Sequence, residues 1–134
     1  MLKTGTTLNA QLARVYSEIG HTDTIVVTDA GLPIPQQVER VDLAVKQNLP
    51  RFLELLDVTL ASVAVEGALL RDEVKTASPE LLQAVKERLD PLGVEIKIMP
   101  HVDFKKETHK CRAAIRSGEF TSYANVILTC GVVY

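Results

Sequence analysis

One short apolar run constrains most of what this chain can fold into. Residues 24–28, TIVVT, are all β-branched and too few for a helix, so they predict a strand buried on both faces. Before this run, Asn9 can cap a helix with an apolar stripe, and Gly20 can end that helix in a left-handed conformation. After it, residues 30–37, AGLPIPQQ, contain Gly31 and two prolines and predict a rigid loop. The pattern predicts a central strand in a layered fold.

The rest of the chain alternates strand-like and helix-like segments. Further strands are predicted within residues 40–45, 66–70, 94–99, 113–118 and 124–134. Helices are predicted from Pro50 to Val63, and from a Ser78 cap and Pro79 to Leu89, with a short helix and loop over residues 101–111. Alternating strands and helices indicate an α/β fold. We therefore expect one domain, residues 1–134, with a mixed central sheet flanked by helices.

Composition narrows the class of protein. The net charge is -2, with acidic and basic residues interspersed, which argues against a nucleic-acid partner. The sequence has no run of about 18 apolar residues that would predict a membrane span, and the N-terminus lacks the apolar core of a signal peptide. We therefore expect a cytoplasmic protein with no membrane partner. In the cytoplasm, we expect Cys111 and Cys130 to be reduced thiols. Hydrophobic residues make up 46% of the chain. This share fits either self-association or a core rich in Val and Leu.

Two polar residues flank the TIVVT run and are candidates for chemistry. His21 precedes the strand, and its imidazole can donate and accept protons near neutral pH. Asp29 follows the strand, where open α/β sheets collect ligand groups. We expect both side chains to face one cleft. Each residue also has a structural alternative, because a histidine at a helix end is often a capping or surface group, and Asp29 can form a turn with the following loop.

Later polar residues add to this set. His101 follows Pro100 at the end of a predicted strand, and an extended backbone from Ser122 would put Tyr123 and Asn125 on one face, where a phenol and an amide can bind hydroxyl groups. The structural alternatives are a surface histidine and an aromatic and turn residue at a strand start. A metal site from His101, His109 and Cys111 is disfavoured because their spacing matches no common motif. Nucleotide, acyl-transfer and zincin motifs are absent.

The ordered motifs resemble the D-ribose pyranase family over essentially the whole chain. They are LNAQLARVYSEIGHTDTIVVTDAGLPIP, RVDLAV with LPRF, PHVDFK, IRSGEFTSYANVIL and the final GVVY. The related fucose mutarotases share the GH and GE…Y.N elements, but the GLPIP after the aspartate favours the ribose branch. The resemblance implies a cytoplasmic isomerase that interconverts β-pyranose and β-furanose ribose without a metal or organic cofactor.

The resemblance also implies roles for residues and an assembly. His21 takes the place of the proton donor, and the substrate contacts are Asp29, His101, Tyr123, Ala124 and Asn125. The family usually has proline where this chain has Ser122, which predicts a looser loop there. The resemblance further implies a ring-shaped homo-oligomer, described as a decamer for the family, with pockets near subunit boundaries.

Three alternatives remain at this point. The chain could be a non-catalytic sugar-binding or regulatory module, a mutarotase of another monosaccharide such as fucose, or a structural subunit of a larger assembly. The rate of exchange between pyranose and furanose forms, measured for each sugar, distinguishes these alternatives, because only a catalyst for that sugar accelerates the exchange.

Overall fold

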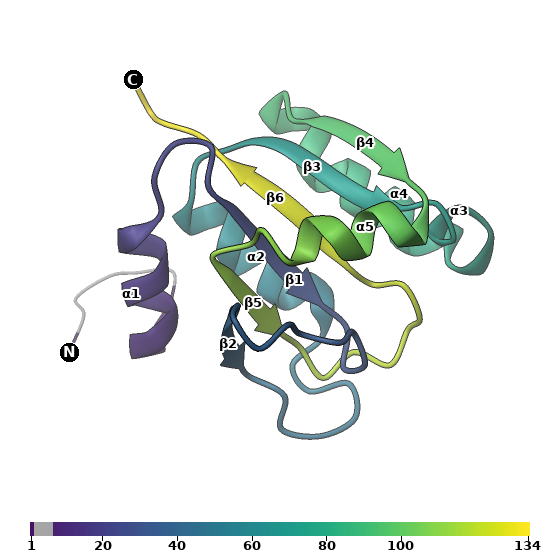
Figure 1. Ribbon diagram of the computed structural model, residues 1–134, viewed down its shortest axis with the longest axis horizontal. Helices are drawn as coiled ribbons and strands as arrows, with labels where there is room; N and C mark the ends of the chain where they lie inside the picture. Colours follow the sequence, from purple (N-terminus) through teal and green to yellow (C-terminus); the bar gives the residue numbers. More distant parts are fainter. Residues whose placement is uncertain (2–6) are drawn as a thin grey trace.

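The computed structural model describes Met1 and residues 7–134, and its centre is a six-stranded mixed sheet with the strand order β2-β5-β1-β6-β3-β4 (Figure 1). β6 is antiparallel to both of its neighbours, and the other pairs are parallel. The carboxyl ends of the five mutually parallel strands therefore meet at one edge of the sheet. The strands are β1 (Thr24–Thr28), β2 (Glu39–Asp42), β3 (Val65–Arg71), β4 (Glu95–Met99), β5 (Ala113–Arg116) and β6 (Val126–Cys130).

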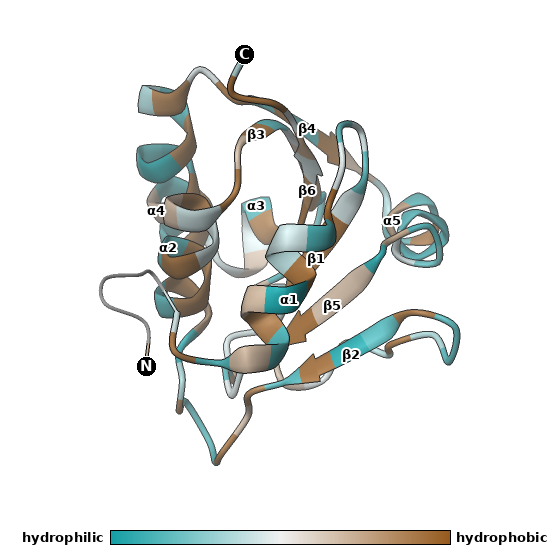
Figure 2. Cartoon of the chain, turned by 90° about the vertical axis from the view of Figure 1, so that its left-hand side faces the viewer, coloured by the Kyte–Doolittle hydropathy of each residue, from teal (hydrophilic) through white to brown (hydrophobic). Residues whose placement is uncertain are grey.

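Helices cover both faces of the sheet (Figure 2). Apolar residues of α1, α2, α3 and α4 pack in one core cluster with Ile25 and Val27 of β1, whereas Phe104 of α5 packs with Val26 on the other face. The helices are α1 (Ala10–Glu18), α2 (Phe52–Ser62), α3 (Val74–Ala77), α4 (Pro79–Leu89) and α5 (His101–Thr108), with a 3-10 turn η1 (Asp90–Leu92) after α4. The expected α/β layered fold with a flanked mixed sheet is confirmed.

The central strand is buried as its sequence predicts. Ile25, Val26 and Val27 are at most 1% exposed, so successive side chains fill both cores. The predicted cap of α1 is also confirmed, because the Asn9 side chain accepts a hydrogen bond from the Leu12 N–H at 2.9 Å. The start of α1 and the strand β1 thus follow from local sequence signals.

Several local predictions are wrong, each for a physical reason. α1 ends at Glu18, and Gly20 is not left-handed; its N–H donates instead to Asp23 Oδ2 at 2.9 Å. Ser78 precedes α4, but its hydroxyl donates to the Ser122 carbonyl rather than capping the helix. The last strand ends at Cys130, so residues 131–134 lie outside the sheet. A short-range hydrogen bond to Asp23 replaces the expected helix stop at Gly20, whereas a long-range hydrogen bond to Ser122 replaces the expected cap at Ser78.

Among the described residues, no helix is both long and apolar enough to cross a membrane, and no group of three or more His, Cys, Asp or Glu side chains could hold a metal ion. The N-terminal stretch in which a signal peptide was sought includes residues 2–6, which lie outside the described residues. Cys111 and Cys130 are buried free thiols, and burial raises their pKa values to about 11 and about 12.

Candidate functional site

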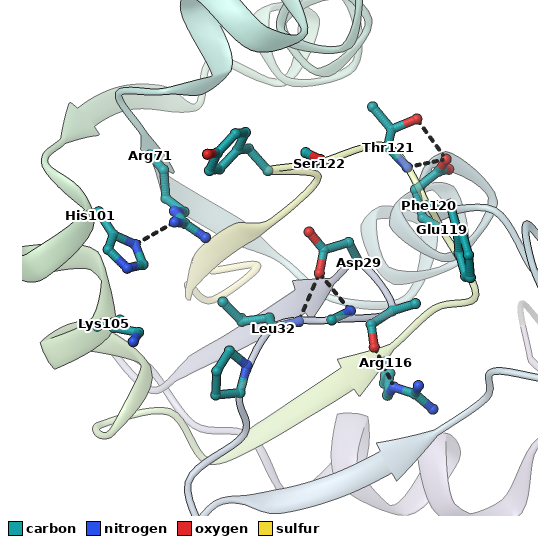
Figure 3. A pocket seen from close by; sticks show the side chains of 14 residues that line it. Asp29, Leu32, Arg71, His101, Lys105, Arg116, Glu119, Phe120, Thr121 and Ser122 are labelled. Carbon is teal, nitrogen blue, oxygen red and sulfur yellow. Dashed lines mark hydrogen bonds between the residues drawn. The ribbon is translucent and has the colours of Figure 1, made fainter.

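A cavity of about 670 Å³ opens at the sheet edge where the parallel strands end (Figure 3). β1, β3 and β5 each deliver a polar residue there, and the first residue of α5 lies beside them. This is the edge at which open α/β sheets bind ligands. The lining residues are Asp29, Ala30, Gly31, Leu32, Pro33, Arg71, His101, Lys105, Arg116, Glu119, Phe120, Thr121, Ser122 and Tyr123.

Asp29 is held in this cavity by the loop that follows it. Its Oδ1 accepts the N–H groups of Gly31 and Leu32 at 3.0 and 2.9 Å, which forms the turn expected as its structural alternative. Its Oδ2 accepts one further hydrogen bond, from Asn125 Nδ2 at 3.1 Å. An ionised carboxylate has about four acceptor positions. One acceptor position therefore remains for a ligand, so Asp29 is both a turn residue and a pocket residue.

Asn125 lies behind Asp29 and outside the set of residues that line the cavity. The residue is 1% exposed, its Oδ1 accepts the Asp29 N–H at 2.9 Å, and its Nδ2 donates to the Asp29 carboxylate. Each end of the amide makes one hydrogen bond to Asp29, and direct binding of ligand hydroxyls by Asn125 stays a prediction. Asn125 positions Asp29.

His101 and Tyr123 line the cavity, and both contact Arg71. His101 begins α5 after Pro100, and its Nδ1 forms a hydrogen bond with Arg71 Nη2. The Arg71 guanidinium lies 4.8 Å from the centroid of the Tyr123 ring. His101 and Tyr123 thus come from separate elements, and both contact Arg71, which was not among the predicted site residues.

The predicted extended run from Ser122 is wrong. β6 begins at Val126, and Tyr123 has a φ of 67°, in the left-handed region, so Tyr123 and Asn125 do not share a strand face. Ala124 is fully buried in the core, and neither it nor Asn125 is among the residues that line the cavity. The polar sequence SYAN therefore forms a turn that sends one side chain into the pocket and another behind it.

Glu119 holds the loop that precedes this turn. Its carboxylate accepts hydrogen bonds from the Phe52 N–H, from Arg51 Nε and from the N–H and hydroxyl of Thr121. Burial alone would raise the pKa of Glu119, but these hydrogen bonds outweigh it and hold the pKa below its ordinary value. Together with the hydrogen bond from the Ser78 hydroxyl to the Ser122 carbonyl, these contacts hold the loop at several points, where the sequence predicted a looser loop.

His21 lies at the opposite end of β1 from this cavity. β1 alone spans about 13 Å at roughly 3.3 Å per residue, and His21 is not among the described residues that line the cavity. Its side chain is 54% exposed, and its Nε2 lies 3.2 Å from the Glu66 carboxylate. The expectation that His21 and Asp29 face one cleft therefore fails within one chain.

Three lining residues of the cavity, Arg71, Glu119 and Arg116, were not among the predicted site residues. Arg116 Nε donates to the Ala30 carbonyl at 3.0 Å, and its Nη1 donates to the Asp42 carboxylate, so it braces the loop after Asp29. Arg71 and Arg116 share one signal, because each is a charged residue at the end of a short apolar strand. Glu119 gives no such signal, because a lone glutamate in a loop carries no sign of its burial.

The cavity suits a small molecule with several hydroxyl groups. It offers one free carboxylate acceptor position, a histidine, two arginines and an exposed lysine, with apolar surface from Leu32, Pro33 and Phe120. Such a mixture of donors, acceptors and apolar surface binds hydroxyl groups and ring carbons together. Nothing in the set resembles a covalent nucleophile with an adjacent base.

Comparisons with known proteins agree with this chemistry. The model of the RbsD / FucU transport protein family matches residues 1–133. The chain is similar to the D-ribose pyranase of Aliivibrio salmonicida, with 42% identity over 99% of this chain and 100% of the relative, and to that of Laribacter hongkongensis, with 48% identity over 95% of each.

Two solved structures resemble the fold over nearly its full length. Bacillus subtilis RbsD complexed with D-ribose has 40% identity and a TM-score of 0.95, with full coverage of both chains. The fucose mutarotase of Streptococcus pneumoniae in complex with L-fucose has 26% identity and a TM-score of 0.84, over 99% of this chain and 100% of its own. The ribose-bound structure is the more similar of the two.

Proposed function

The chain belongs to the RbsD / FucU transport protein family, and from this premise we propose that it is a D-ribose pyranase, an isomerase that interconverts the β-pyranose and β-furanose forms of D-ribose. The observation that carries the proposal is the fold match, at a TM-score of 0.95 and 40% identity, to a structure that holds D-ribose. The cavity at the strand ends supplies groups suited to that sugar. We expect it to act in the cytoplasm, as the family resemblance implies.

The cavity binds the sugar in this proposal. Asp29 accepts a hydrogen bond from a hydroxyl at its free acceptor position, and Asn125 fixes the carboxylate from behind. His101 and Tyr123 contact the sugar from α5 and from the turn before β6. The side chain of Phe120, which is 61% exposed, packs against the ring carbons of the sugar. Ala124 serves as a core residue that sets the turn.

Ring opening needs two proton movements. One proton reaches the ring oxygen while the anomeric hydroxyl loses one, after which the open chain rotates and a different hydroxyl closes on the aldehyde. We assign the first proton to His21, which donates it to the ring oxygen and recovers one when the new ring closes; general acid-base catalysis of this kind contributes about 10²- to 10⁴-fold. The free acceptor position of Asp29 is the group in the cavity suited to take the anomeric proton.

His21 must come from a second copy of the chain, because it lies at the far end of β1 from the cavity. Three features of that end support this assignment. The imidazole is half exposed and is oriented by Glu66. Thr22 has a φ of 71°, uncommon for a β-branched residue, in the turn that presents His21. The Thr22 N–H donates to the Cys130 carbonyl at 2.9 Å, which places His21 beside the C-terminal segment.

The C-terminal segment supplies an apolar surface for that contact. Val133 and Tyr134 are 93% and 100% exposed in the single chain, directly after β6. Exposed apolar side chains next to a polar catalytic group are typical of a subunit interface. We propose a homo-oligomer, decameric by the family resemblance, in which His21 of one copy completes the cavity of its neighbour.

Exchange spectroscopy tests the proposed function. Proton NMR saturation transfer on D-ribose measures the pyranose-furanose exchange rate with wild type, His21→Ala and His109→Ala. His109 is a matched control because it hydrogen-bonds Gln37 at the far end of α5. We expect acceleration by wild type and His109→Ala, and its loss in His21→Ala. Binding of ribose without faster exchange would indicate a non-catalytic module, and neither binding nor exchange would indicate a structural subunit.

A second candidate substrate has a specific observation in its favour. The fold matches a fucose mutarotase with L-fucose bound at a TM-score of 0.84, although the identity is 26%. The same exchange assay on ribose, L-fucose and galactose ranks the substrates. We expect the largest acceleration with ribose.

A further inference from the structure

Arg71 occupies the wall of the cavity between α5 and the turn before β6. It is the last residue of β3, and its side chain is 10% exposed. Figure 3 shows the guanidinium reaching from the end of the strand toward His101, with the cavity on its open side. A buried arginine needs compensating contacts, because burying a charge without them is strongly unfavourable.

The compensating contacts of Arg71 are two aromatic rings and one carboxylate at long range. Its guanidinium carbon lies 4.8 Å from the centroid of the Tyr123 ring and 5.9 Å from that of Phe104, both within the range of cation–π interactions. The nearest carboxylate oxygen, Glu73 Oε2, is 3.9 Å from Arg71 Nε, and both atoms are buried without a hydrogen-bond partner among the described residues. The two rings, together with Glu73, therefore hold the guanidinium in place beside His101.

The hydrogen bond from Arg71 fixes the state of His101. Guanidinium nitrogens donate and do not accept, so the His101 Nδ1 in contact with Arg71 Nη2 must be the acceptor and carry no hydrogen. The ring is then neutral, with its hydrogen on Nε2. Among the described residues, His101 has no other hydrogen-bond partner, and the residue lines the cavity.

We propose that Arg71 is a positioning residue that holds His101 in the Nε2–H tautomer, so that His101 donates a hydrogen bond to a sugar oxygen and does not relay protons. The same guanidinium supports the Tyr123 ring, which couples the two walls of the cavity. The identity of the sugar rests on the proposed function, whereas the tautomer of His101 does not. Lysine would not replace Arg71, because an ammonium lacks the planar fork that both stacks and donates.

The tautomer is measured directly by ¹⁵N solid-state NMR of the apo protein labelled at histidine. The chain has three histidines, and His101→Gln identifies the His101 signals. We expect a non-protonated Nδ1 and a protonated Nε2 in wild type, and loss of this single state in Arg71→Met. Arg116→Met is the matched control, since Arg116 lines the same cavity but contacts Ala30 and Asp42 instead of His101. It should leave the His101 signals unchanged.

Kinetics separate donation from relay. We expect Arg71→Met to raise KM for ribose about 5- to 30-fold, because the His101 donor is no longer held in place and one buried hydrogen bond to the sugar is lost. His101→Gln should raise KM less than this, and kcat should change less than about 3-fold in both variants. Glutamine retains an N–H near the position of Nε2 but cannot relay a proton. A 100-fold fall of kcat in His101→Gln would overturn the proposal, as would a protonated Nδ1 in wild type.

Two further comparisons keep the test decisive. If Arg71→Met fails to fold, as judged by circular dichroism, Arg71→Lys provides the second variant, and an unchanged His101 tautomer and KM in Arg71→Lys would contradict the role of the planar guanidinium. If wild type shows the Nε2–H tautomer dependent on Arg71 but does not accelerate ribose exchange, the proposed function fails and the positioning role stands. If exchange is fast and the tautomer is independent of Arg71, the positioning role fails alone.

Discussion

The two ends of β1 carry ionisable residues in opposite settings. At the carboxyl end, Asp29 is enclosed by hydrogen bonds from its own loop and from Asn125. At the amino end, His21 is half exposed and contacts one exposed carboxylate, that of Glu66. A single chain therefore builds a preorganised end at Asp29 and leaves His21, the proton donor of the proposed function, on the surface. In the proposed function, the single chain therefore builds the binding end, and catalysis requires the assembly that brings His21 to a neighbouring cavity.

The largest expected effect is the loss of activity when His21, at the amino end of β1, is replaced. His21→Ala should lower the acceleration of ribose exchange about 10²- to 10⁴-fold, the usual contribution of a general acid-base group. The free energy of unfolding should change by less than about 0.5 kcal/mol, since exposed ion pairs contribute little. Exchange NMR and urea unfolding measure the two quantities. Wild-type exchange by the variant would remove His21 from the mechanism.

Glycine substitutions compare the two ends by stability. A Cβ on Gly118 would lie 2.4 Å from the Lys46 carbonyl oxygen and 2.6 Å from that of Leu49, whereas a Cβ on Gly20 would lie 3.6 Å from its nearest neighbour. Gly118→Ala should therefore lower the free energy of unfolding by about 3 kcal/mol. Gly20→Ala should leave it nearly unchanged. Equal urea midpoints for the two variants would contradict the idea that the pocket end is the more tightly built.

Asn125 provides a finer test of the binding end. Asn125→Ala leaves the Asp29 N–H without its partner, so it should lower the free energy of unfolding by about 2 kcal/mol and weaken ribose binding. Asn125→Asp should be worse near neutral pH, because it places a second carboxylate against Asp29. Unfolding curves and ribose titration of both variants check the order. An aspartate variant that binds as well as wild type would show that Asn125 does not position Asp29.

The smallest effect concerns Glu119, whose pKa is held below its ordinary value. A depressed pKa in the folded state stabilises the protein above the ordinary glutamate pKa of about 4.3, and this stabilisation is lost as the pH falls through the folded value. Glu119→Gln should cost about 1–2 kcal/mol at pH 7 and should flatten the acid limb of a plot of unfolding free energy against pH. Glu66→Gln, at the exposed end, should change the stability at pH 7 by less than about 0.5 kcal/mol. An unaltered acid limb in Glu119→Gln would contradict the assigned hydrogen bonds.

Elements with strong local signals could be predicted from the sequence. The β-branched run of β1 and the Asn9 cap of α1 are examples, and both are confirmed. Turn geometry could not be predicted where distant partners decide it. Tyr123 adopts a positive φ, and the Ser78 hydroxyl leaves its own helix to bind the Ser122 carbonyl, because tertiary contacts outweigh local preference.

The candidate site was predictable as a set of residues more than as a geometry. Asp29, His101 and Tyr123 do line one cavity. The place of Asn125 behind Asp29, the burial of Ala124 and the contacts of Arg71 depend on how separate strands align, which no local pattern encodes. The separation of His21 from Asp29 follows from the strand itself, since residues before and after a strand lie at its opposite ends.

Complementation between two variants tests most directly the proposal that His21 of one copy and Asp29 of its neighbour form one site. His21→Ala and Asp29→Asn are purified separately, dissociated, mixed in equal amounts and reassembled, and ribose exchange is then measured by NMR. If one copy supplies His21 and its neighbour supplies Asp29, about one site in four of a random mixture regains both native residues, and activity rises well above that of either variant alone. Activity in the mixture no higher than the mean of the two separate variants would contradict the account.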